Sequence, residues 1–206
     1  MHARGSTTMD RTAPADHPIL EPLAKRWSPR AFDPRPVPPE ALRSMFEAAR
    51  WAPSSFNEQP WAFLVAVRER ADEFERALAG LNPWNRAWAK NAGVLAFTAA
   101  KRDFARNGRP NRHAWHDLGQ AAAYLAAQAA ALGLAAHQMG GILPDEVRRI
   151  FGVPDGWDLP TGIAIGWPGD PAALPEDYRD DELAPRERKP QAEFVFSGGW
   201  GRAAVL

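Results

Sequence analysis

Hydrophobic and polar residues alternate with a helical period in the first half of the chain. Within residues 38–51 the apolar side chains fall at i, i+3, i+4 and i+7, at Leu42, Met45, Phe46 and Ala49. This spacing places one apolar stripe on one face of an α-helix. The two prolines at the start of the segment suit a first helical turn, where a missing N–H donor costs nothing. The pattern therefore predicts a helix from about 38 to 51 that packs on the core.

Other stretches show either short apolar runs or helical patterns. The apolar runs predict buried strands at 61–67, 93–100, 134–139 and 158–167, and a last short strand at 194–196. The helical patterns predict helices at 18–26, 70–80, 112–132 and 143–151, and three of these end at a glycine. Residues 168–192 contain five prolines and many charges, which predicts an extended polar connection.

The order of these elements indicates the fold class. The strands are separated by helices without a regular strand–helix–strand alternation, which favours an α+β layer fold over a doubly wound sheet. No G-x-G-x-x-G sequence follows a predicted strand, and this argues against a Rossmann nicotinamide domain. The 112–132 helix carries alanine nearly all round, so we expect other helices to approach it closely.

Composition narrows the function classes. A chain of 206 residues suits one domain. A formal net charge of zero gives no reason to expect nucleic acid or an anionic membrane surface as a partner. The absence of cysteine excludes disulfides, thiolate metal sites and a cysteine nucleophile. Without a signal-peptide pattern or a run of about 20 apolar residues, we expect a cytoplasmic protein with a flexible segment at 1–17 and one domain at 18–206.

Two short motifs offer complementary polar chemistry. The first, R-W-S-P-R at 26–30, carries two guanidinium groups and a hydroxyl, which are suited to gripping a phosphate. The second, A-P-S-S-F-N-E-Q-P-W at 52–61, offers small hydroxyls and amides that can line the polar edge of a flat heterocycle. Together they look like the two ends of a flavin mononucleotide (FMN) site.

This pair of motifs resembles the nitroreductase family, whose signature is R-x-S-x-R/K followed by A-P-S-S-x-N-x-Q-P-W. Three further stretches resemble family motifs in the same order: N-P-W-N-R-A-W-A-K at 82–90, H-Q-M-G-G-I at 137–142 and R-E-R-K at 186–189. The resemblance implies a central, mostly antiparallel sheet surrounded by helices in an intertwined homodimer. It also implies FMN at the subunit interface, with NAD(P)H as the electron donor and ping-pong hydride transfer through flavin N5.

The resemblance carries over a set of cofactor-binding residues, namely Arg26, Trp27, Ser28, Arg30, Pro53, Ser54, Ser55, Asn57, Asn85, Met139, Gly140, Gly141, Arg186 and Arg188. It assigns Arg26 and the two C-terminal arginines to the FMN phosphate, and Arg30 to the N1–O2 edge of the ring. Two-electron reduction leaves negative charge at that edge, so a cation there is physically reasonable. Backbone N–H groups at 139–141 would face N5 and O4, and glycines let the backbone approach a planar ligand.

The chain departs from the family at two positions. Trp27 stands where relatives often carry Arg or His, so only a backbone contact is expected from it. Trp88 stands where the family has a lysine near the flavin, which leaves more of the charge stabilisation to Arg30.

No side chain stands out as a catalytic acid or base. His137 is the nearest candidate, since histidine is the commonest acid–base residue near neutral pH. His113, His116 and Asp117 are spaced to chelate a metal on one helical face, but no partner motif accompanies them. We therefore predict no catalytic side chain and no metal, and we interpret the second group as a polar cluster at a helix start.

The implied activity is FMN-dependent reduction of a small-molecule acceptor, such as a nitroaromatic compound or a quinone, by NAD(P)H. Two alternatives stay open at this point. A specialised relative could reduce or dehydrogenate another small substrate, such as an enal or a semialdehyde. A flavin-binding protein could also keep the site with little turnover. The sequence does not choose between NADH and NADPH.

The arginines predict the identity of the bound flavin. Arg26, Arg186 and Arg188 suffice for one terminal phosphate, and the chain has no glycine-rich loop for a pyrophosphate. Chromatography of the flavin released on denaturation should therefore give FMN, and stoichiometric FAD would contradict the assignment.

Overall fold

The computed structural model describes residues 10–206, in which a six-stranded sheet forms the centre. Its strands are β1 Phe32–Asp33, β2 Trp61–Val67, β3 Val94–Lys101, β4 Ala135–Met139, β5 Trp157–Asp158 and β6 Gly162–Pro168. The main order is β1-β6-β3-β2, with β4 beside β6 and β5 beside β3. All pairings are antiparallel, which confirms the predicted α+β class.

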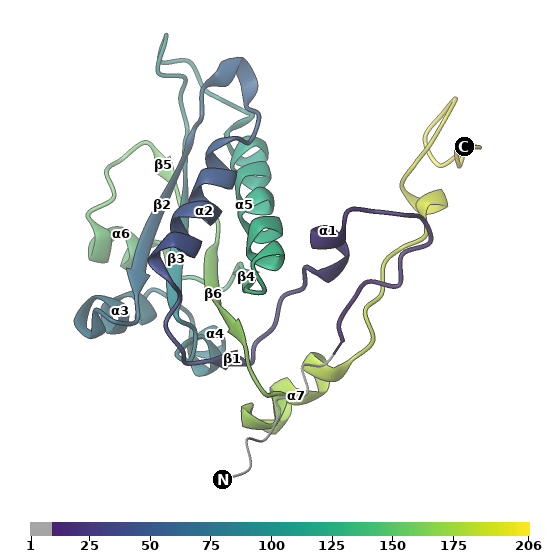
Figure 1. The fold of residues 1–206 in the computed structure, drawn as a ribbon. Helices are drawn as coiled ribbons and strands as arrows, with labels where there is room; N and C mark the ends of the chain where they lie inside the picture. Colours follow the sequence, from purple (N-terminus) through teal and green to yellow (C-terminus); the bar gives the residue numbers. More distant parts are fainter. Residues whose placement is uncertain (1–9) are drawn as a thin grey trace.

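Helices cover both faces of this sheet (Figure 1). The helices of residues 10–206 are α1 Glu21–Lys25, α2 Pro39–Arg50, α3 Ala71–Leu78, α4 Pro83–Ala89, α5 Ala114–Ala131, α6 Pro144–Phe151 and α7 Glu176–Leu183. Short 3-10 turns lie at Ser55–Asn57, Pro171–Ala173 and Gln191–Glu193. Helices α2 and α5 cover one face, and α3, α4 and α6 cover the other.

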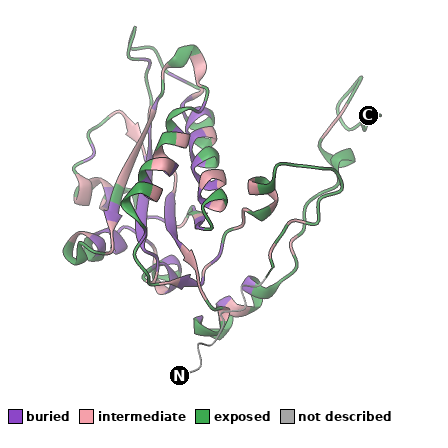
Figure 2. Ribbon diagram, viewed as in Figure 1, coloured by how far each residue is buried: buried purple, intermediate pink, exposed green. Residues whose placement is uncertain are grey.

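Strand β3 shows why both faces are covered. Leu95 and Phe97 point into a core with Trp88 from α4, whereas Val94 on the opposite face packs with Met45 from α2. Successive side chains of a strand alternate between faces, so an uninterrupted apolar strand needs cover on both. Figure 2 accordingly shows buried residues through the sheet and on the inward sides of the helices.

The register of β2 against β3 fixes which loops share an end of the sheet. Trp61 pairs with Ala100, and Val67 pairs with Val94. The loop before β2 therefore lies beside the end of β3 and the start of α5. Strand β1 pairs with the last residues of β6, beyond the start of β3. The segment that leads into β1 thus lies at the opposite end of the sheet.

After β6 the chain leaves the sheet and forms a long arm. Residues 184–206 run beside the N-terminal segment of residues 10–28, away from the helices that cover the sheet (Figure 1). Most of this arm is exposed (Figure 2), and its large apolar side chains Phe194 and Trp200 are 60% and 95% exposed.

Two predictions for this region are wrong. The predicted extended connection 168–192 contains α7, because Tyr178 and Glu182, one helical turn apart, are both buried. Residues 194–196 do not form the predicted strand. A strand needs a neighbour, and in the described part of the chain this segment has only the isolated bridge between Phe196 and Ala203.

Other differences concern boundaries. The predicted helix 18–26 is reduced to Glu21–Lys25, with a proline in its first turn. The predicted strand 158–167 is divided into β5 and β6, and the short helix α4 was not among the predicted elements. Within residues 10–206 no helix is both long and apolar enough to cross a membrane.

The buried carboxylate of Glu182, which attaches α7 to the segment before β1, is predicted to contribute to stability. Glu182 is 2% exposed, and its carboxylate accepts the backbone N–H groups of Arg30 and Ala31 at 2.8–3.1 Å. Replacing Glu182 with alanine leaves these donors without an acceptor, so the free energy of unfolding should fall by about 3 kcal/mol. Urea denaturation should detect this fall. The exposed Asp180→Ala variant should change the value by less than about 0.5 kcal/mol, and equal effects of both variants would contradict this role of Glu182.

Candidate functional site

Four arginines gather where the N-terminal segment meets the C-terminal arm. The guanidinium group of Arg186 donates to the backbone carbonyls of Arg11, Ala24 and Arg26, the last two at 2.9 Å. Arg11 reaches back to the carbonyl of Ala184 at 2.7 Å. Within residues 10–206, no carboxylate lies within 4.0 Å of Arg11, Arg26, Arg186 or Arg188. These four residues are called the arginine cluster below.

The charges of the arginine cluster repel one another. Burial, followed by the nearby charge of Arg188, lowers the pKa of Arg26. Burial and then the charges of Arg26, Arg188 and Arg11 lower the pKa of Arg186. Arginine still stays protonated, so the cluster has an uncompensated positive charge. A phosphate bound here would relieve the repulsion and accept charge-assisted hydrogen bonds.

The side chains of residues 26–30, in the turn between α1 and β1, have different partners. Arg26 donates to the Ser28 hydroxyl at 3.3 Å, while the Trp27 ring lies 5.1 Å from the guanidinium carbon of Arg11. Arg30 forms an ion pair with Asp181 at 3.2 Å. The turn is therefore anchored on α7, with Arg30 as a paired cation next to the arginine cluster.

Strand β4 supports this turn through His137. Its Nδ1 lies 2.9 Å from the carbonyl oxygen of Pro29, so Nδ1 carries the proton and donates. The imidazole packs against Trp88 in a tilted arrangement, with 4.6 Å between the ring centroids. Burial, with smaller effects of Arg30 and Arg26, lowers the pKa of His137 from 6.5 to about 4. His137 is therefore neutral near pH 7.

Trp88 itself is a core residue. It is 1% exposed, stacks on Phe32 and packs against the tilted ring of His137. In this position the indole does not face solvent beside the arginine cluster, so Trp88 leaves the lysine slot of the family unfilled. Its Nε1–H has no hydrogen-bond acceptor among the described residues.

The end of β4 meets α4 at a close contact. Asn85 is 8% exposed and donates from its side-chain amide to the carbonyl of Gly141 at 3.1 Å. A Cβ at Gly141 would overlap the side-chain amides of Asn82 and Asn85, so a larger residue there would displace these amides. By contrast, nothing lies within 4 Å of a Cβ built on Gly140, whose backbone is open to a ligand. Met139 is buried and points into the core.

The second motif forms a strained loop. Phe56, Asn57 and Gln59 have φ of 55°, 55° and 51° without being glycine, and each such conformation costs about 1–2 kcal/mol. Side chains hold the loop in this shape. The carboxylate of Asp117 accepts the N–H of Ser55 at 3.0 Å, and the hydroxyl of Ser54 accepts the N–H of Gln59 at 3.0 Å. Strain that is maintained by surrounding contacts is typical of ligand-binding segments.

The predicted site residues therefore do not all come together in one chain. Arg26–Arg30 lead into β1, and Arg186 binds the carbonyl of Arg26, whereas Pro53, Ser54, Ser55 and Asn57 precede β2 at the other end of the sheet. The end of β4 lies between these two groups, because Met139 pairs with Gly162 at the start of β6, while β1 pairs with the end of β6. Strand β3 separates these ends by eight residues, which correspond to about 25 Å. Figure 1 shows the same separation, with the loop between α2 and β2 at the top and β1 near the bottom.

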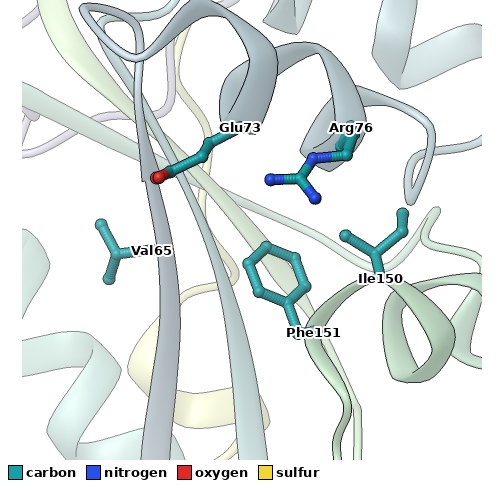
Figure 3. Close-up of a pocket in the computed structure, with 5 residues that line it drawn as sticks. All are labelled: Val65, Glu73, Arg76, Ile150 and Phe151. Atoms are coloured by element: carbon teal, nitrogen blue, oxygen red, sulfur yellow. The ribbon is translucent and has the colours of Figure 1, made fainter.

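A hollow elsewhere on the surface contains none of these residues (Figure 3). It lies between the edge strand β2 and helices α3 and α6, lined by Val65, Glu73, Arg76, Ile150 and Phe151. Three of these side chains are apolar, and the hollow lacks the clustered cations that an anionic cofactor needs. We therefore assign the site to the two motif groups. Within residues 10–206, no group of three or more His, Asp or Glu side chains is arranged to hold a metal ion.

With this geometry in place, comparisons with known proteins identify the family. The model of the nitroreductase family matches residues 23–167, which include both motifs and the end of β4. The chain belongs to the nitroreductase family. This family membership confirms the resemblance seen in the sequence motifs.

Individual nitroreductase relatives agree with this membership. A Thermus thermophilus protein named NADH dehydrogenase is 33% identical over 177 residues, covering 71% of this chain and 84% of that protein. A solved oxidoreductase containing FMN superimposes with a TM-score of 0.87 at 36% identity, covering 94% of this chain and 98% of the other. An FMN- and NADPH-dependent nitroreductase from Sphigopyxis sp. strain HMH shares the fold, with a TM-score of 0.67 at 24% identity over 87% and 98% of the two chains.

The structure adds residues that the nitroreductase motifs did not indicate. Arg11 joins the arginine cluster from outside the matched region, and Glu182 comes from a segment that was predicted to be extended. In the sequence, Asp117 has the spacing of a possible metal ligand with His113 and His116. In the structure, its carboxylate binds the N–H of Ser55 and positions the loop. The contact between residues 55 and 117 could not be read from a helical spacing.

The depressed pKa of His137 predicts a pH dependence of stability. The unfolded chain binds a proton at this residue below about pH 6.5, whereas the native protein resists protonation until about pH 4. Stability is therefore complete above pH 6.5 and falls by about 3 kcal/mol as the pH drops from 6.5 to 4. His137→Asn cannot titrate, so the difference in unfolding free energy between wild type and variant should shrink across this window. A constant difference, measured by urea denaturation, would show that His137 titrates normally.

Proposed function

We propose that this nitroreductase is an FMN-dependent NAD(P)H oxidoreductase that reduces nitroaromatic or quinone-type acceptors. The observation that carries the proposal is the arginine cluster, whose positive charge has no carboxylate within 4.0 Å among residues 10–206. The solved relative with 36% identity contains FMN. A NAD(P)H-flavin oxidoreductase from Aliivibrio fischeri is 30% identical over 93 residues, or 44% of this chain and 43% of that protein.

The residues present fit FMN. Arg26 and Arg188 have guanidinium donors available for a terminal phosphate, and Arg186 fixes the backbone around them. Bound FMN would supply the redox chemistry, accepting electrons from NAD(P)H and passing them to the acceptor. The protein's part is to hold the phosphate, present backbone at 139–141 to the ring and exclude water.

The proposal includes a site shared between two protomers of a homodimer. Because the loop at 53–57 and the arginine cluster lie at opposite ends of one sheet, a single chain cannot bring both to one flavin. Two-fold symmetry can bring the loop of one protomer to the cluster of its partner, and the reverse, to form two complete sites.

The exposed apolar surface supports the same assembly. Trp115 and Tyr124 on the outer face of α5 are 58% and 45% exposed, although the rest of this face is mostly alanine and glycine. The arm of residues 184–206 adds Phe194 and Trp200. A second copy of the chain would cover these surfaces, and the arm of residues 184–206 would extend along that copy.

Subunit complementation tests the shared site. One chain carries Arg26→Ala and Arg188→Ala, and the other carries Ser54→Ala, Ser55→Ala and Asn57→Ala. Each homodimer should retain little FMN. A hybrid dimer, purified through two different tags, contains one intact site and one doubly damaged site. It should therefore bind about half the wild-type FMN and show about half the NAD(P)H–quinone turnover.

The result of complementation separates the alternatives. If each site were built within one chain, every site of the hybrid would be damaged, and its FMN content would stay as low as in the homodimers. Normal FMN binding in wild type without oxidation of NADH or NADPH would contradict the enzymatic function.

A further inference from the structure

A basic hairpin lies directly against the strained loop. Residues 102–112 connect β3 to α5 and contain four arginines and a single carboxylate, Asp103. The carboxylate of Glu58 in the loop accepts the N–H of Ala105 in the hairpin. The rings of Phe56 and Phe104 meet edge to face, with 6.0 Å between their centroids. The hairpin is therefore attached to the loop that we assign to the flavin.

The hairpin is held in one shape by its own backbone. The N–H groups of Phe104 and Gly108 donate to the carbonyls of Arg109 and Phe104, at 2.9 and 2.8 Å. Gly108 has φ of 67°, a left-handed conformation that favours glycine. Phe104 is 9% exposed and anchors the turn in the protein. Charged groups on this hairpin consequently have a defined position.

Arg106 is arranged to receive an anion. Its guanidinium carbon lies 4.2 Å from the Phe56 ring centroid and 5.3 Å from that of Phe104. Stacking fixes the plane of the guanidinium group and leaves its edge N–H donors free. Within residues 10–206, neither Arg106 nor Arg109 has a carboxylate within 4.0 Å or a side-chain hydrogen bond to an acceptor. The nearby Glu58 accepts a backbone N–H, and Arg102 pairs with Asp158.

We propose that Arg106 and Arg109 form a subsite for the phosphate groups of the pyridine dinucleotide. This inference rests on the proposed function, in which the loop at Ser54–Asn57 contacts the flavin that NAD(P)H reduces. The nicotinamide ring must reach the flavin. The phosphates of the dinucleotide therefore extend away from the flavin, toward the segment that borders the loop. The hairpin supplies that border with unpaired guanidinium groups, which suit phosphate oxygens. Phe56, which is 74% exposed, offers a flat surface next to them.

Calorimetry on the FMN-loaded protein tests the subsite without turnover. The probes are NADP+, NAD+ and nicotinamide riboside, which lacks phosphate. Arg106→Ala should weaken NADP+ binding about tenfold, the scale of a charge-assisted hydrogen bond, and leave nicotinamide riboside within about twofold. Arg106→Lys keeps the charge but not the planar fork, so it should recover only part of the loss. Arg109→Ala provides a second variant on the same hairpin.

Arg70→Ala is the matched control, because Arg70 is an exposed arginine next to the far end of β2. It should leave the affinity for all three probes unchanged, and FMN content and Tm should equal those of wild type in every variant. An effect larger for NADP+ than for NAD+ supports contact with the 2′-phosphate, and equal effects support contact with the pyrophosphate. Equal weakening of nicotinamide riboside, or no change with any probe, would overturn the subsite. If the variants show these binding effects but the wild-type protein does not oxidise NADH or NADPH, the proposed function is overturned and the subsite is not.

Discussion

The antiparallel pairing of β2 with β3 over their whole length is the constraint on which the arrangement of the site depends. Because Trp61 pairs with Ala100 and Val67 with Val94, the loop before β2 cannot lie at the end of the sheet where β1 and the arginine cluster meet. The sheet thus keeps the two halves of the family signature apart within one chain. In the proposed homodimer, two chains together bring these halves to one site.

Hydrogen bonds and one ion pair hold the cationic half of the candidate site in place. The guanidinium group of Arg186 donates hydrogen bonds to backbone carbonyls, and these bonds hold the N-terminal segment against the C-terminal arm. Buried Glu182 accepts two backbone N–H groups of the turn, and Asp181 neutralises Arg30. These acidic residues anchor the turn while leaving the arginine cluster unneutralised. The result is a preorganised positive site whose repulsion a phosphate would relieve.

The two halves are rigid for different physical reasons. The cationic turn is supported by His137, whose imidazole is kept neutral by burial and packs against Trp88. The loop at 53–59 instead stores backbone strain, which Asp117 and the neighbouring hairpin maintain. In both halves, a side chain buried in the protein controls the position of backbone that the proposed function places against FMN. This arrangement fits chemistry in which the protein orients a cofactor and no side chain acts as acid or base.

The sequence by itself determined the elements whose pattern is local and the family to which the chain belongs. The helical period of residues 38–51, the apolar runs of β2 and β3 and the ordered motifs were sufficient, because periodicity and short polar motifs depend on neighbouring residues. The tertiary structure decided that Trp88 is buried in the core, that α7 interrupts the polar connection and that Arg11 joins the arginine cluster. It also divided the site between opposite ends of the sheet. These features depend on contacts between residues far apart in the chain, such as Arg30 with Glu182 and Ser55 with Asp117, which no local pattern encodes.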